Sequence, residues 1–407
     1  MTSHRSGRSS TGLPVDRLAV MLAACGEQSR QSIGTRLAKP AAAGEPQDYP
    51  PEYAAVRPGD ELDWDRLSRY LQSHFDDLGS LVAVRQFPNG AANLTYLLEF
   101  AGRPLVIRRP PFGEIAVGAH DMKREYRALS RLWQHYDRAP RAYLLCEDNT
   151  VAGADFLVIE YRAGQVVWGS IPPSMAGHEN VARRVGFAVV DALAELHLLD
   201  PEQAGVSDLG RPDGFVDRQL RGWQQRWLAV APGLMASTGL TPGNDVVAEV
   251  GAELAATKPA TVRSSVLHND FKIDNCQFDP ANPDRVLSVF DWDMATIGDP
   301  LVDLGTLLNY WPDPSDDPAN RPSHPAGQED MGLPTRAEVV ARYAEITGAD
   351  VAAAGWYEAF GSWKTAIVIA QLYHRYLQGD SHDLRQGLKG DRIVPLARRA
   401  QAILASR

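Results

Sequence analysis

The sequence predicts an α+β fold in two lobes, a small strand-rich lobe over residues 51–160 and a larger helical lobe over residues 161–407. Two observations support this division. Residues 81–164 show short apolar alternations between turn residues, which is typical of strands. From about residue 178 the apolar residues recur at helical spacing. A chain of 407 residues can form two cores, and a cleft between lobes commonly holds a ligand.

Residues 1–50 are predicted to be a disordered leader followed by a linker. The first dozen residues are polar, basic and poor in large apolar side chains. The stretch that ends in Leu22-Ala23-Ala24-Cys25 is similar to a lipoprotein signal, but its apolar part is short, so we interpret it as part of the leader. Residues 39–52, KPAAAGEPQDYPPE, have the composition of a linker.

Composition argues against several kinds of partner and compartment. The net charge of −10 disfavours nucleic acid as the main partner. No apolar run approaches the roughly 20 residues needed to cross a bilayer. Cys25, Cys146 and Cys276 lie far apart, so no disulfide framework is predicted and a reducing compartment, the cytoplasm, is favoured. We interpret Cys276 as a small buried residue.

The small lobe is predicted to contain a helix, three strands, a second helix and a further strand. Residues 63–75 have an aspartate cap and helical spacing. Residues 81–111 form three strands separated by glycine-containing turns. Residues 119–136 carry the apolar stripe of a helix, and residues 155–164 form a buried strand that ends in a polar segment.

The larger lobe is predicted to be mostly helical. Residues 180–200, 333–348 and 356–379 have the apolar spacing of helices. Two short strands, residues 265–267 and 285–290, lie between them. If these two strands pair as a hairpin, the polar residues that follow each of them face one loop.

The densest polar cluster follows the first of these short strands, in residues 266–275, VLHNDFKIDN. Phosphoryl transfer requires magnesium held by hard oxygen ligands, a carboxylate that takes the hydroxyl proton, and a cation on the other phosphates. Asp270 is the candidate base. Asn275 and Asp291 are candidate magnesium ligands, and Asp293 supports the metal directly or through water. We expect these carboxylates to be unpaired, because no fixed cation lies near them in the sequence.

The other polar residues of these motifs are interpreted as structural. His268 is expected to bond backbone carbonyls and hold its loop rather than transfer a proton. Asp299 and Asp303, in GDPLVDLG, fit a helix N-cap and a first-turn acid. Lys272 and Asp274 are interpreted as surface charges.

Together, the motifs HNDFKIDN, DWD and GDPLVDLG resemble the signature of the aminoglycoside/choline-kinase-like phosphotransferases, which share the protein-kinase-like fold. The segments NLTY, VIRRPPFG and KREYRAL resemble the branch whose members occur fused to acyl-CoA dehydrogenases. The resemblance covers residues 80–380 and implies ATP and Mg²⁺ as cofactors. It also implies that Asp270 is the catalytic base and that Asn275 and Asp291 bind the magnesium.

The resemblance further implies a phosphate-binding cation on the third strand. Glu125 matches the helix glutamate that pairs with this cation. The family usually has lysine on the strand, whereas this sequence offers Arg108 or Arg109. Alternation along a strand lets one of the two face the cleft, and we choose Arg108. Arginine binds phosphate in a bidentate manner, so it is not equivalent to lysine there.

Two further segments match parts of a nucleotide site. Residues 89–96, which include Asn93, match the loop that covers the phosphates. This loop has one glycine in NGAAN and would otherwise be interpreted as a plain hairpin turn. Glu160 and Tyr161 match the hinge whose backbone meets the adenine.

The leading function is ATP-dependent transfer of a phosphoryl group to a hydroxyl of a small molecule, such as a hydroxyacyl-CoA. The alternatives are an aminoglycoside O-phosphotransferase, a nucleotide-binding pseudokinase with a regulatory role, and a helical scaffold that binds no nucleotide. The sequence leaves the acceptor and the oligomeric state open. Candidate acceptor-pocket residues on the helices are Arg218, Arg221, Trp223, Trp227, Trp363, Tyr373 and Arg375.

Overall fold

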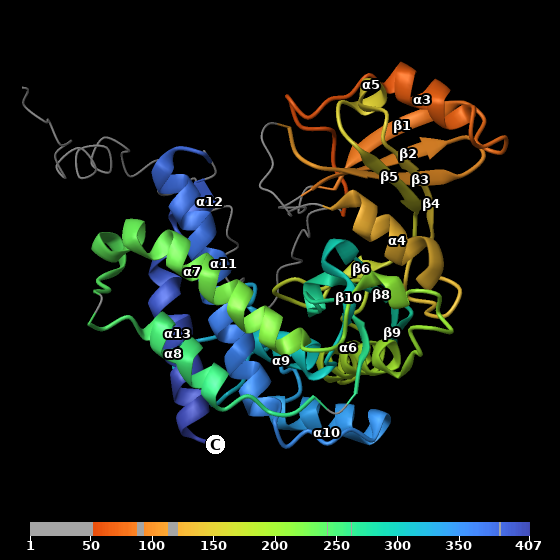
Figure 1. Cartoon of the computed structure of the whole chain (residues 1–407). Coiled ribbons are helices and arrows are strands. Elements are labelled where there is room, and N and C mark those ends of the chain that lie inside the picture. Colours follow the sequence, from red (N-terminus) through yellow and green to blue (C-terminus); the bar gives the residue numbers. More distant parts are fainter. Residues whose placement is uncertain (1–51, 88–92, 113–120, 242, 262, 382–383) are drawn as a thin grey trace, which may run out of the picture. The chain divides into compact units, whose positions relative to one another are not determined.

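A five-stranded antiparallel sheet forms the small lobe (Figure 1). Its strands are β1 (Leu81–Gln86), β2 (Leu94–Phe100), β3 (Pro104–Arg109), β4 (Ala142–Cys146) and β5 (Phe156–Glu160). They lie in the order β1-β2-β3-β5-β4, so β3 is central. Arg108 of β3 lies opposite Thr95 of β2 and Leu157 of β5. Pairing on both sides fixes the backbone at Arg108.

Helices accompany this sheet, and aspartate caps explain where two of them begin. They are α3 (Trp64–Gln72), α4 (Met122–Leu132) and the single turn α5 (Asn149–Ala152). Asp63 and Asp121 each accept a backbone N–H from the first turn of α3 and α4. Glu125 lies on the buried face of α4 with Leu129. The predicted helices and strands of this lobe are confirmed, and β4 and α5 are additions that the sequence did not predict.

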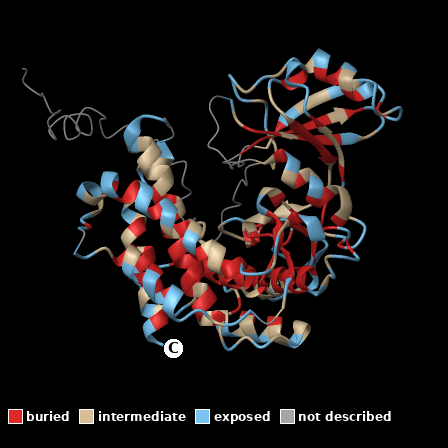
Figure 2. Ribbon diagram, viewed as in Figure 1, coloured by how far each residue is buried: buried red, intermediate tan, exposed pale blue. Residues whose placement is uncertain are grey.

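The larger lobe is built mainly from helices. They are α6 (Val181–Leu198), α7 (Phe215–Thr238), α8 (Val246–Ala256), α9 (Leu301–Tyr310), α10 (Arg336–Thr347), α11 (Ala354–Gln378), α12 (Leu384–Gly387) and α13 (Ile393–Ala405). One core joins α6, α9 and α10 to α4 of the small lobe, and a second joins α7, α8, α11 and α13. Figure 2 shows these buried faces in red. The helices predicted over residues 180–200, 333–348 and 356–379 are confirmed.

Short strands in the larger lobe pair differently from the predicted hairpin. They are β6 (Gln165–Val166), β7 (Ser265–Leu267), β8 (Cys276–Asp279), β9 (Asn282–Val289) and β10 (Thr296–Gly298). The hairpin of β7 with β9 is wrong, because β7 pairs with β10 and β9 pairs with β8. Strands β6, β8 and β10 are too short for alternation to reveal them. A loop runs directly from β7 to β8, so residues 268–275 still lie beside the end of β9.

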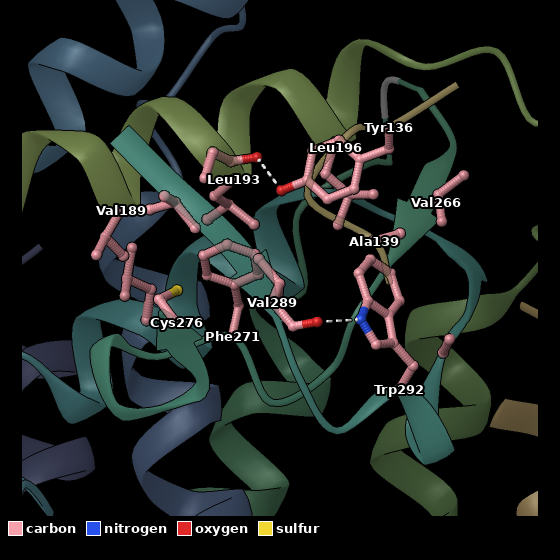
Figure 3. Packing of buried hydrophobic residues seen from close by; sticks show 14 of the residues in the cluster. Tyr136, Ala139, Val189, Leu193, Leu196, Val266, Phe271, Cys276, Val289 and Trp292 are labelled. Atoms are coloured by element: carbon pink, nitrogen blue, oxygen red, sulfur yellow. Dashed lines mark hydrogen bonds between the residues drawn. The ribbon is translucent and has the colours of Figure 1, made fainter. Parts of the chain in front are cut away.

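A buried apolar cluster supports the loop between β7 and β8. Phe271, in this loop, is fully buried and belongs to one cluster with Leu193 and Val289 (Figure 3). The indole Nε1–H of Trp292 donates to Val289 O at 2.7 Å. Cys276 is buried in the same cluster, which raises the pKa of its thiol and confirms its interpretation as a small buried residue. The polar side chains of the loop are therefore presented from a packed base.

This computed structural model describes residues 52–87, 93–112, 121–241, 243–261, 263–381 and 384–407. The predicted leader, most of the linker and residues 89–92 of the predicted covering loop lie outside these residues. The described residues belong to one structural unit, Tyr49–Arg407. Within the described chain, no helix combines the length and apolar character needed to span a membrane.

Candidate active site

A cavity of about 570 Å³ lies where the sheet, α4, the β7–β8 loop and α11 meet. The predicted site residues that line it are Arg108, Glu125, Glu160, Tyr161, Asp270, Asn275 and Asp291. Asn93 and Asp293 are not among its lining residues. The fold therefore gathers most of the predicted residues, although 183 positions separate Arg108 from Asp291.

Asp303 of α9 anchors the β7–β8 loop. Its carboxylate accepts the backbone N–H of His268 at 2.6 Å and that of Asn269 at 2.7 Å. Asn269 has a left-handed backbone with φ of 67°, which asparagine tolerates better than most residues. Burial opposes ionisation of Asp303, but hydrogen bonding and attraction from His197 outweigh it and lower the pKa of Asp303. Asp303 is the first-turn acid of α9 that the sequence predicts, and its contacts with the β7–β8 loop are an addition that the sequence did not predict.

His268 has the structural role that the sequence predicts. Its Nε2 lies 2.7 Å from Phe290 O, and its Nδ1 accepts the backbone N–H of Asp270 at 3.2 Å. Because Nδ1 accepts, Nε2 carries the proton and donates to the carbonyl. Burial lowers the pKa of His268, against the attraction of Asp303 and Asp270. The neutral ring thus ties the loop to the end of β9.

We expect His268 to make the folded protein less stable as the pH falls below about 6.5, the ordinary pKa of histidine. The unfolded chain binds a proton there that the folded chain does not, so stability is lost from pH 6.5 down to the folded pKa. His268→Gln does not titrate, so its melting temperature should fall less than that of the wild type between about pH 7 and about pH 5. Equal falls in the two proteins would contradict this assignment.

Two neighbours in the same loop hold Asp270. Asn275 Nδ2 donates to Asp270 O at 2.9 Å and to Asp270 Oδ2 at 3.2 Å. Lys272 Nζ lies 2.9 Å from the same Oδ2 and 3.9 Å from Asp274 Oδ2. The interpretation of Lys272 and Asp274 as surface charges is wrong, because the 3-10 turn Ile273–Asn275 folds the loop back on itself. Asp270 Oδ1 has no partner among the described residues, so it can accept a bond from a substrate hydroxyl.

Arg108 balances much of the negative charge in the cavity. Its guanidinium forms ion pairs with Glu125, at 2.9 Å, and with Asp291. Burial opposes the charge on Arg108, but Asp291 and Glu125 outweigh it and raise the pKa of Arg108. The expectation of unpaired carboxylates is therefore wrong, since Asp291 pairs with Arg108 and Asp270 with Lys272.

Arg109 points away from the cavity, as alternation along the strand predicts. Its Nε–H donates to Pro110 O at 2.9 Å and its Nη1–H to Ala152 O at 2.8 Å. Burial lowers the pKa of Arg109. The side chain therefore supports the sheet, while Arg108 lines the cavity.

We expect Arg108→Ala to weaken the binding of Mg–AMP-PNP by about tenfold or more, because a charged hydrogen bond contributes about 1.5–3 kcal/mol. Arg109→Ala should lower the melting temperature and leave nucleotide affinity unchanged. Calorimetric titration of both variants checks this. Equal losses of affinity would show that Arg108 does not bind the phosphates.

Asn275 and Asp291 carry oxygens that fit a magnesium ion. Asn275 donates through Nδ2, and its Oδ1 has no partner in the described part of the chain. Asp291 pairs with Arg108 through Oδ1, and its Oδ2 has no partner among the described residues. Two protein oxygens suffice, because Mg²⁺ takes further ligands from phosphates and water. The described residues contain no group of three or more His, Cys, Asp or Glu able to hold a metal.

Asp293 fits this site less well than its two neighbours. Burial, and then the charge of Asp291, raise the pKa of Asp293 to about 8. Asp293 is also not among the residues that line the cavity. The metal-binding role of Asp293 stays a prediction.

The residues of the predicted nucleotide hinge and covering loop have mixed surroundings. The backbone N–H of Glu160 donates to Arg141 O at 2.8 Å, and its Oε2 accepts from Arg162 Nε at 3.0 Å. A backbone donor to the adenine would therefore come from Tyr161 or Arg162.

Asn93, in the predicted covering loop, is buried, and its amide has no hydrogen-bond partner among the described residues. Its contact with a nucleotide stays a prediction.

Glu52 is a cavity residue that the sequence did not reveal. It lines the cavity and accepts the backbone N–H of Val166 at 2.7 Å and Gln277 Nε2 at 3.3 Å. Burial raises the pKa of Glu52. The sequence places Glu52 in the linker, because no local pattern marks a single residue that packs on a distant strand.

The acceptor-pocket candidates of the sequence are not lining residues of this cavity. The three tryptophans among them are buried in the core of α7, α8, α11 and α13. Aromatic residues at helical spacing more often belong to a core than to a pocket. The cavity is lined instead by residues of α9 and α11, namely Thr306, Tyr310, Gly361, Lys364, Thr365, Val368 and Leu372.

Sequence comparison connects the chain to known phosphotransferases and to larger proteins. Residues 83–339 match the model of the phosphotransferase enzyme family. Acyl-CoA dehydrogenase family member 11 of Rattus norvegicus is 29% identical over 351 residues, 84% of this chain and 43% of that protein. Acyl-CoA dehydrogenase family member 10 of Mus musculus is 28% identical over 335 residues, 81% of this chain and 30% of that protein. The chain thus spans less than half the length of these relatives.

Solved structures share the fold. A Ralstonia eutropha protein provisionally assigned as an aminoglycoside phosphotransferase is 25% identical, with a TM-score of 0.68 over 85% of this chain and 99% of that chain. The GDP complex of aminoglycoside 2′-phosphotransferase-IIIa is 14% identical, with a TM-score of 0.53 over 84% of this chain and 99% of that chain. The predicted two-lobed, protein-kinase-like α+β fold is confirmed. Because the family model covers more than half of its length, the chain belongs to the phosphotransferase enzyme family.

Proposed function

We propose that this protein is an ATP-dependent phosphotransferase that moves the γ-phosphoryl group to a hydroxyl of a small molecule. One observation carries the proposal. The Asp270 carboxylate, the Asn275 and Asp291 oxygens and the Arg108–Glu125 pair converge on one cavity. These are the parts that phosphoryl transfer requires. A structurally similar phosphotransferase has been solved as a GDP complex, which supports the binding of a nucleotide by this protein.

Each residue has a distinct role in the proposed reaction. Asp270 Oδ1 orients the acceptor hydroxyl and takes its proton as the oxygen bonds to the γ-phosphorus and the bond to the β-phosphate breaks. Lys272, fixed against Asp270 Oδ2, holds this carboxylate in place. Asn275 and Asp291 would hold the Mg²⁺, which would neutralise charge on the phosphates. Arg108, oriented by Glu125, binds the phosphates that are not transferred.

A hydroxyacyl-CoA is the acceptor class that we favour over an aminoglycoside. The relatives that match most of this chain are named as acyl-CoA dehydrogenase family members, and the chain covers only part of them. A polycationic aminoglycoside would require a dense acidic patch on the acceptor side. The α9 and α11 residues that line the cavity include no acid. We place the reaction in the cytoplasm.

A coupled assay of ADP release tests the proposed function. The purified protein with Mg–ATP is given hydroxyacyl-CoAs, aminoglycosides, choline and small amino alcohols in separate reactions. We expect hydroxyacyl-CoAs to raise ADP release above the acceptor-free rate. Tight Mg–ATP binding without stimulation of ADP release by any of these acceptors would instead support the pseudokinase. Absence of nucleotide binding would exclude both the phosphotransferase and the pseudokinase.

A further inference from the structure

Lys364 is a buried cation in the part of the cavity wall that α9 and α11 form. It lies in the middle of α11, lines the cavity and is 8% exposed. Its Nζ donates one hydrogen bond, to Asn269 O at 2.9 Å. A lysine ammonium has three donors, so two remain without an acceptor among the described residues. Because Asn269 directly precedes Asp270 in the chain, this bond attaches Nζ to the backbone beside the candidate base.

The charge of Lys364 has no counter-ion in the described part of the chain. No carboxylate there lies within 4.0 Å of Nζ, and Asn269 O is a neutral acceptor. Trp223 offers a weak attraction, with its ring centroid 5.7 Å from Nζ. Burial lowers the pKa of Lys364, against the attraction of Asp270 and Asp303. A buried ammonium is costly unless an anion or several acceptors complete it.

Close packing of two helices brings Lys364 to this position. A Cβ on Gly361 of α11 would lie 2.7 Å from Gly305 O of α9, so glycine is required for this approach. Val368 and Leu372 follow Lys364 at intervals of four residues and also line the cavity. One face of α11 therefore presents a cation near Asp270 and an apolar strip beyond it.

We propose that Lys364 determines acceptor specificity by binding an anionic oxygen of the acceptor, such as a carboxylate, close to the hydroxyl that Asp270 orients. The apolar strip of Val368 and Leu372 contacts the carbon chain of that acceptor. This inference rests on the proposed function and departs from it at one point. It favours a free hydroxy acid, or a related acidic acceptor, over the corresponding hydroxyacyl-CoA, because the acyl carbonyl of a thioester has no anionic oxygen near the hydroxyl. A cationic acceptor is disfavoured, because it would meet the positive charge of Lys364 in the cavity.

Three probes that differ in one group test this inference. They are 3-hydroxyoctanoate, octane-1,3-diol and 1-aminooctan-3-ol, titrated by calorimetry into the protein loaded with Mg–AMP-PNP. We expect the wild type to bind the acid at least about 30-fold more tightly than the amine. Lys364→Met should remove this preference, because it should weaken the binding of the acid about 30-fold while the diol binds as before.

Matched variants separate specificity from support of the loop. Lys364→Arg keeps the charge and should keep the preference for the acid. Lys364→Gln is a second neutral variant, used if the methionine variant does not fold. Lys123→Met removes an exposed lysine that pairs with Glu147 and should behave as the wild type.

Several results would overturn the inference. If Lys364→Met weakens the binding of all three probes equally, Lys364 only supports the β7–β8 loop. Unchanged affinity for the acid in that variant, or a wild type that does not bind the acid, also contradicts the inference. Binding of AMP-PNP and release of ADP are measured separately, so failure of the nucleotide site is distinguished from failure of acid recognition.

Discussion

Asp270→Asn is expected to lower kcat by about 10²- to 10⁴-fold, the usual contribution of a positioned general base. The amide keeps the size of the carboxylate but cannot take the hydroxyl proton. Asp270 is outside the proposed metal and phosphate ligands, so the affinity for Mg–AMP-PNP should not change. Steady-state kinetics with any active acceptor, together with calorimetry, measures both quantities.

The control for this variant is Asp284→Asn. Asp284 pairs with Arg184 at 2.8 Å on the surface, at the start of the same β9 that leads to Asp291. It should retain wild-type kcat. Near-wild-type turnover in Asp270→Asn would show that Asp270 is not the base. Loss of nucleotide binding in that variant would indicate that Asp270 binds the metal.

Asp303→Asn is expected to reduce the free energy of unfolding by about 3–5 kcal/mol, the range for breaking a buried charge network. Asp303 is fully buried, and it accepts the two backbone N–H groups that hold His268 and Asn269. The amide can accept at one atom only, so one of these donors is left unpaired. Urea denaturation measures the loss. Turnover should also fall at temperatures where the variant is folded, because the backbone at Asn269 loses its support.

Asp299→Asn is the matched control for this second variant. Asp299 is also buried, beside the start of α9, and it accepts Tyr357 OH at 2.6 Å and Leu301 N–H at 3.0 Å. It makes no hydrogen bond to the β7–β8 loop. We expect lower stability with unchanged kcat. If Asp303→Asn also kept its kcat, the anchoring of the loop would not matter for turnover.

Much of this site could be predicted because its main residues follow short strands in recognisable strings. HNDFKIDN places Asp270 and Asn275 on one loop, and alternation along β3 separates Arg108 from Arg109. The pairing of Arg108 with Asp291 could not be predicted from proximity in the sequence. It depends on how the sheet of the small lobe meets the end of β9.

The part of the cavity wall that α9 and α11 form could not be predicted, for a different physical reason. Helical spacing shows which residues share a face, but it does not show which face is buried in a core and which lines a cavity. Trp223 and Trp363 lie in the core, and Lys364, next to Trp363 in the chain, lines the cavity. The sequence does not predict strands β6, β8 and β10, because segments of two to four residues show no periodicity.

Mass spectrometry of the acceptor after incubation with γ-¹⁸O-labelled ATP and Mg²⁺ shows whether this protein transfers the γ-phosphoryl group to a hydroxyl. We expect one added phosphoryl group that carries the label, bound as an ester to a hydroxyl, with no such product from Asp270→Asn. Labelled inorganic phosphate as the sole product, or an equal yield of ester from Asp270→Asn, would contradict the claim that this cavity transfers a phosphoryl group with Asp270 as the base.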